Sequence, residues 1–146
     1  MHVTKNTRVN NNGHHTYFPV FILGNHKRIN REGGVMPEFS KKSIELLSQC
    51  DTRLQEICKD AIIIYDFTVI CGYRSKEEQE SLFADGKTKL HYPDSKHNKN
   101  SSEAVDIAPY PIDWEDAGRF KLLAGIMFGI AHSKGIKIRW GRGLGR

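Results

Sequence analysis

Ser95-Lys96-His97, followed by Asp106 within Glu103-Ala104-Val105-Asp106-Ile107-Ala108-Pro109, is the stretch that most constrains the fold of this chain. The histidine lies in a polar loop, whereas the aspartate lies in a short apolar run typical of a strand. A carboxylate in such a strand is costly to bury unless a cation or several donors compensate its charge. Imidazole nitrogen and carboxylate oxygen both suit zinc, so the pair is a candidate metal site. The alternative is a solvated loop histidine and an aspartate that caps a turn.

The residues before this stretch predict helices and one strand. Apolar residues at helical spacing predict one amphipathic helix over residues 40–64. Residues 67–71 form a short, mainly apolar run that predicts a strand ending at Gly72. Ser75 and Glu78 match a capping box, which predicts a helix from there to about Ala84.

The residues after the predicted helix at 75–84 form a loop and then predict two strands and a long helix. Residues 86–102 are a polar loop, and residues 104–108 predict a strand that ends at Pro109. Asp113 is the expected cap of a helix over residues 114–134, which Gly135 should end. Residues 136–140 predict a last strand. The expected fold class is α+β, with helices packed on a small antiparallel sheet.

Four motifs in this order resemble a known family of zinc peptidases. The resemblance covers about residues 39–141 and rests on Asp66-Phe67-Thr68-Val69 with Gly72-Tyr73-Arg74-Ser75, on Ser95-x-His97, on Ala104-Val105-Asp106-Ile107 continuing into Ala-Pro-Tyr-Pro-Ile-Asp-Trp, and on Gly135-Ile136-Lys137-Ile138-Arg139-Trp140-Gly141. The family includes D-alanyl-D-alanine carboxypeptidases and the L-alanyl-D-glutamate endopeptidases of phage endolysins. The resemblance implies a hedgehog/D-Ala-D-Ala-peptidase-like fold.

The resemblance also implies a function and roles for individual residues. His97 and Asp106 would bind Zn²⁺, and Arg74 would hold a peptide carboxylate or the oxyanion at the scissile carbonyl. Gln79 would support the substrate or Arg74, and Ser95 would hydrogen-bond near His97 rather than act as a nucleophile. The implied substrates are the stem peptides of peptidoglycan, cut as by a phage endolysin. The motifs do not decide between endopeptidase and carboxypeptidase action, although the phage-like Ala-Pro-Tyr-Pro-Ile-Asp-Trp run favours an endopeptidase.

Members of this family also carry a third metal ligand and a proton-shuttling carboxylate late in the chain. No Asp, Glu or His follows His132 here, and His132 and His91 are weak substitutes, so no general base or third ligand is assigned. The codons GGT-CGG-GGA-CTG-GGA-CGG would encode residues 141–146, and removing one C would give Gly-Gly-Asp-Trp-Asp-Gly, as in the family. We therefore expect a frameshifted, truncated chain with weak zinc affinity and impaired hydrolysis. The alternative is a catalytically inactive remnant or a cell-wall-binding module.

The charge distribution divides the chain into a leader and a domain. The formal net charge of the 146 residues is +5, and five Lys or Arg against Glu32 give residues 1–35 a charge of +4. Basicity therefore belongs to the leader, and nucleic-acid binding is not expected. Residues 1–35 are expected to be disordered, and residues 36–146 to form one peptidase-like domain, incomplete at its C-terminus. Codons for Glu32-Gly33-Gly34 can form a purine-rich ribosome-binding sequence, so we expect translation to start at Met36. The alternative is that residues 1–35 are a natively translated N-terminal arm.

The cysteines and the hydropathy of the chain indicate the cellular compartment to expect. Cys50, Cys58 and Cys71 show no metal-type spacing, and we expect small buried hydrophobes without a disulfide, as in reducing cytosol. No signal peptide and no transmembrane stretch is visible, so membrane insertion is not expected. We expect a monomer made in the cytoplasm of a bacterial or phage-infected cell that acts on the wall after release.

Overall fold

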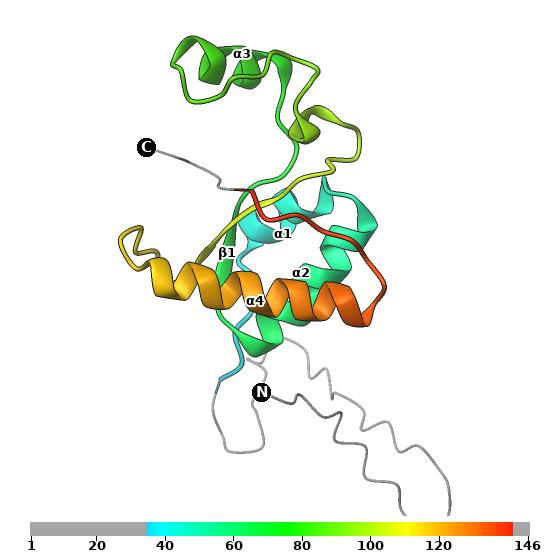
Figure 1. Cartoon of the computed structure of the whole chain (residues 1–146), viewed down its shortest axis with the longest axis vertical. Coiled ribbons are helices and arrows are strands. Elements are labelled where there is room, and N and C mark those ends of the chain that lie inside the picture. The colour runs from blue at the N-terminus through cyan, green and yellow to red at the C-terminus, as the bar shows by residue number, and fades with distance from the viewer. Residues whose placement is uncertain (1–34, 142–146) are drawn as a thin grey trace, which may run out of the picture.

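The computed structural model describes residues 35–141, so the expectations about the leader and about residues 142–146 lie outside the described part. The elements, in chain order, are the helices α1 (Lys41–Ser48) and α2 (Thr52–Ile64), strand β1 (Phe67–Cys71), helix α3 (Lys76–Ala84), a short 3-10 helix η1 (Lys96–Asn98), strand β2 (Asp106–Pro109) and helix α4 (Ala117–Ser133) (Figure 1). Within the described residues the sheet has two strands, which pair antiparallel. The expected α+β class is confirmed.

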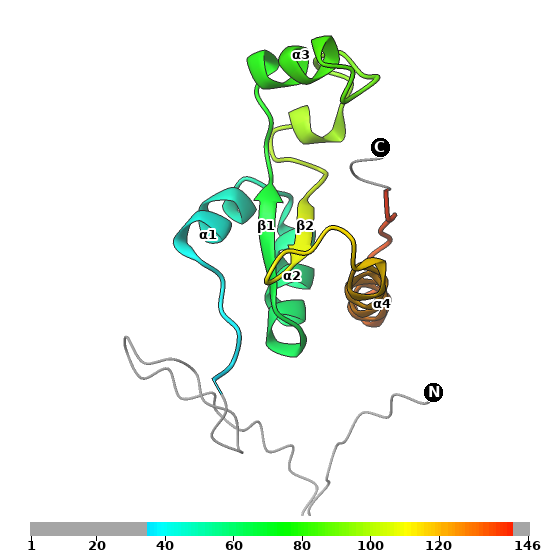
Figure 2. The same ribbon diagram turned by 90° about the vertical axis from the view of Figure 1, so that its left-hand side faces the viewer.

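The sheet lies between helices that bury its apolar side chains. Helix α1 packs beside β1, and α4 packs against both α2 and β2 (Figure 2). The core contains Phe67 and Val69 from the sheet, together with Ile57, Leu123 and Met127 from the helices. Helix α3 has no comparable packing and stands apart from the sheet and the other helices (Figures 1 and 2). None of the described helices is both long and apolar enough to cross a membrane.

The predicted single helix over residues 40–64 is wrong, because the chain breaks it between α1 and α2. The amide of Asp51 donates to the carbonyl of Ser102 at 2.8 Å. The amide of Ser102 in turn donates to the carbonyl of Gln49 at 2.9 Å. These bonds divert the backbone from the helical pattern. Asp51 then caps α2, because its side chain accepts from the amide of Arg53 at 2.9 Å.

The elements after His97 also differ from the prediction in detail. Helix α4 begins at Ala117 with Asp116 as its cap, whereas Asp113 accepts from the amide of Glu115 and closes a preceding turn. Gly135 ends the helix with φ +69°, as expected for a glycine at this position. Residues 136–140 form no strand. Their alternating isoleucines are partly buried against the core, so the alternation reports burial on one side rather than strand pairing.

Candidate metal centre

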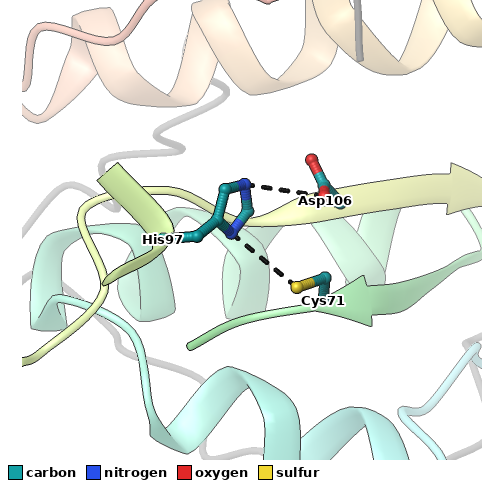
Figure 3. Close-up of side chains that lie close together, drawn as sticks. All are labelled: Cys71, His97 and Asp106. Carbon is teal, nitrogen blue, oxygen red and sulfur yellow. Dashed lines mark hydrogen bonds and ion pairs between the residues drawn. The ribbon is translucent and has the colours of Figure 1, made fainter. Parts of the chain in front are cut away.

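The metal-ligand candidates meet where β1 ends and β2 begins. The strand register pairs Cys71 with Asp106, after an irregularity between Val69 and Cys71. His97, from η1, lies beside this pair (Figure 3). Its Nε2 is 3.5 Å from Oδ2 of Asp106, and its Nδ1 is 3.8 Å from Sγ of Cys71. The structure therefore brings the two predicted ligands together, and it adds a thiol.

The backbone around His97 fixes the position of the ring. The hydroxyl of buried Ser95 accepts from the amide of His97 at 3.3 Å, and the carbonyl of His97 accepts from the amide of Arg74 at 2.9 Å. Nδ1 of the ring lies 2.8 Å from the carbonyl oxygen of Gly72, so Nδ1–H donates there. Ser95 therefore hydrogen-bonds beside His97, and its support of a bound metal stays a prediction.

Gly72 brings the strand end close to helix α1. A Cβ at this position would overlap the carbonyl oxygen of Leu46 and lie 3.1 Å from Sγ of Cys50. Glycine is therefore required for the close approach of the two backbones. The Gly72 carbonyl also accepts from the hydroxyl of Ser102 at 3.1 Å, so one oxygen ties together the histidine ring and the loop before β2.

The surroundings of His97 favour a charged ring in the metal-free protein. Burial lowers the pKa of His97, but hydrogen bonds to Asp106, Cys71 and the Gly72 carbonyl outweigh it, together with the charge of Asp106. The pKa is thereby raised from 6.5 to about 10. In that state Nε2–H points to the carboxylate of Asp106, and a bound cation would take the place of this proton.

The donor set fits zinc. Histidine ligands usually donate their second ring N–H to a carbonyl or carboxylate, which fixes the ring and leaves the other nitrogen for the metal. Gly72 provides such a carbonyl for Nδ1 of His97, which leaves Nε2 for the ion. Two tetrahedral ligands at zinc bond lengths lie about 3.4 Å apart, close to the 3.5 Å between Nε2 and Oδ2 of Asp106. Among residues 35–141, Cys71, His97 and Asp106 each offer one ligand atom, all within 4.8 Å of one another.

Arg74 and Gln79 form a second polar pair beside the ligands. Nη2 of Arg74 is 3.5 Å from Oδ2 of Asp106, and Nη1 donates to Oε1 of Gln79 at 3.2 Å. Gln79 is fully buried, and its Nε2 donates to the carbonyl of Leu90 at 2.6 Å. Both residues are therefore close to the candidate metal site, and the geometry makes Gln79 a partner that positions Arg74.

The prediction that Cys71 is a small buried hydrophobe is wrong. Cys50 and Cys58 are buried, whereas Cys71 is half-buried and lies within 3.8 Å of both His97 and Arg74; all three cysteines are free. The sequence carried only part of the signal that could have found it. Antiparallel pairing of the predicted strands 67–71 and 104–108 brings Cys71, at the end of one, near the first residues of the other, but its pairing with Asp106 depends on the irregularity after Val69.

The two other histidines considered as ligands lie elsewhere. His91 is exposed, with Nδ1 2.9 Å from Oε2 of Glu80 and its ring against that of Phe83. His132 is exposed near the end of α4. Neither belongs to the group formed by Cys71, His97 and Asp106.

Comparison with known proteins bears on what this arrangement does. Residues 36–145 match the sequence model of the family described as phage L-alanyl-D-glutamate peptidase. The chain is 31% identical over 109 residues to the L-alanyl-D-glutamate peptidase of Escherichia phage T5, covering 71% of this chain and 79% of that protein. Its fold is similar to the crystal structure of the Serratia marcescens L-Ala D-Glu endopeptidase ChiX, with a TM-score of 0.62 and 23% identity over 72% of this chain and 80% of the other. The chain belongs to the phage L-alanyl-D-glutamate peptidase family.

Proposed function

We propose that this chain is a zinc-dependent endopeptidase that hydrolyses the amide between L-alanine and D-glutamate in the stem peptides of peptidoglycan. Family membership and the activity in the names of the phage T5 and Serratia proteins support the reaction. The observation that carries the metal dependence is His97, whose Nδ1 is held by the Gly72 carbonyl while Nε2 faces Asp106.

In this proposal the chain's residues divide the work between holding the ion and holding the substrate. His97 Nε2 and a carboxylate oxygen of Asp106 would hold the zinc. The chemistry that zinc supplies when bound is a water molecule of lowered pKa and a polarised carbonyl. The guanidinium of Arg74 offers paired N–H donors to a substrate carboxylate or to the oxyanion of the scissile carbonyl. Gln79 keeps that guanidinium in place from the buried side.

The test is digestion of purified peptidoglycan by the full chain, with added zinc and with a chelator. Cleavage at the proposed bond leaves a new amino group on D-glutamate, which mass spectrometry of the soluble fragments identifies. His97→Ala should abolish fragment release, whereas His132→Ala, which changes an exposed histidine on α4, should not.

Three outcomes would contradict the proposal. Fragments that have lost only a terminal D-alanine would assign carboxypeptidase action instead. Release that persists at full rate in the chelator would remove the metal dependence. Binding to the wall material without any fragment release, with and without zinc, would favour a cell-wall-binding module.

A further inference from the structure

We propose that Cys71 supplies a third protein ligand to the ion held by His97 and Asp106, so that this chain has a Cys-His-Asp metal centre. This inference rests on the proposed function, because it concerns the same ion. Its first support is the strand register, which pairs Cys71 with Asp106 across the antiparallel sheet. Side chains of directly paired residues point to the same face of a sheet, with Cβ atoms about 5 Å apart.

The second support is that both side chains already contact the same guanidinium group. Nη2 of Arg74 lies 3.8 Å from Sγ of Cys71 and 3.5 Å from Oδ2 of Asp106. His97 completes the group, and all three ligand atoms lie within 4.8 Å of one another. Sγ of Cys71 lies 3.8 Å from Nδ1 of His97, so its side chain would turn toward Nε2 to reach an ion held there, where ligand pairs with sulfur are about 3.5 Å apart.

The third support is the chemistry of the thiol and its accessibility. Thiolate is a preferred ligand of zinc and combines with imidazole and carboxylate in protein sites. Cys71 is half-buried at the site, whereas burial raises the pKa of Cys50 to about 11 and that of Cys58 to about 12, which keeps both as thiols. On binding, Cys71 would release its thiol proton and His97 its Nε2 proton to water.

The experiment uses Co²⁺ as a spectroscopic probe in the full chain. Thiolate bound to cobalt gives an intense charge-transfer absorption in the near ultraviolet, which nitrogen and oxygen ligands do not give. Wild type and the control Cys58→Ala, which removes a thiol buried in the core, should both show this band. Cys71→Ser should lose it and should bind zinc at least 100-fold more weakly, a larger loss than the 10–100-fold typical of a residue that only supports a ligand.

X-ray absorption of the zinc-loaded wild type gives a second measurement that needs no variant. A sulfur neighbour at about 2.3 Å supports the inference, and a shell with only nitrogen and oxygen at about 2.0 Å overturns it. Cobalt binding without the charge-transfer band also overturns it, while leaving the zinc site of the proposed function in place. A wild type that binds neither cobalt nor zinc overturns both this inference and the proposed function. A wild type that shows the sulfur signal but does not digest wall material overturns the proposed function alone.

Discussion

Replacement of Gly72 by alanine tests whether a glycine outside the ligand set controls the metal centre. The added Cβ would overlap the Leu46 carbonyl oxygen and lie 3.1 Å from Sγ of Cys50, so the backbone of Gly72 must move. Overpacking of this kind costs about 1–3 kcal/mol. In a domain of this size such a loss lowers Tm by roughly 5–15 °C.

The same movement should displace the carbonyl that holds Nδ1 of His97 at 2.8 Å. Loss of such a supporting hydrogen bond weakens metal binding about 10–100-fold. Thermal unfolding of the metal-free protein and calorimetric titration with zinc measure the two effects separately. The matched control is Gly125→Ala, in the middle of α4, where a Cβ meets nothing within 4 Å and should stabilise by about 0.5–1 kcal/mol. A Gly72→Ala protein with the Tm and zinc affinity of wild type would refute this reasoning.

Three further predictions concern other parts of the site and its supports. Because a cation must displace a proton from His97, whose pKa is raised to about 10, zinc affinity should rise at least about tenfold per unit between about pH 6 and 8; an affinity independent of pH would contradict this. Gln79→Leu should lower the free energy of unfolding in urea by about 1–3 kcal/mol, because Nη1 of Arg74 and the Leu90 carbonyl lose a buried partner, and an unchanged midpoint would count against it. Ser75→Ala removes the capping box of α3 and should cost about 1 kcal/mol, measured as faster hydrogen exchange in α3, whereas exposed Ser81→Ala should have little effect.

The elements with strong local signals were predictable. Strand β1 occupies the predicted residues 67–71, and the capping box of Ser75 and Glu78 starts α3 as its pattern indicated. Both depend on neighbours in sequence, either through alternating burial or through side-chain caps. The break before Asp51 depends instead on hydrogen bonds to Ser102, fifty-one residues away, which no local pattern encodes.

The candidate site was predictable in its residues and only partly in its geometry. The motifs selected Arg74, His97 and Asp106, and the structure places all three within contact of one another; their catalytic roles stay predictions. Cys71 and the Gly72 carbonyl escaped notice, because the first depends on strand register and the second on how the loop folds over the strand end. The missing last strand has a similar cause, since alternating isoleucines need only one buried side and no pairing partner.

The separation of α3 from the rest of the fold has a consequence for chain entropy. Helix α3 lacks apolar packing against the core, and Gln79 and Glu80 connect it to the following loop through polar contacts, so this segment, residues 73–94, should exchange its amide hydrogens faster than the core. Cys71 precedes the segment and His97 follows it. An ion bound by both residues would cross-link the chain into a loop of about 26 residues. Closing a loop of that length lowers the conformational entropy of the unfolded chain, which corresponds to a free energy of about 3.5 kcal/mol. The metal would then act as a reversible cross-link between the two ends of the segment that carries Arg74.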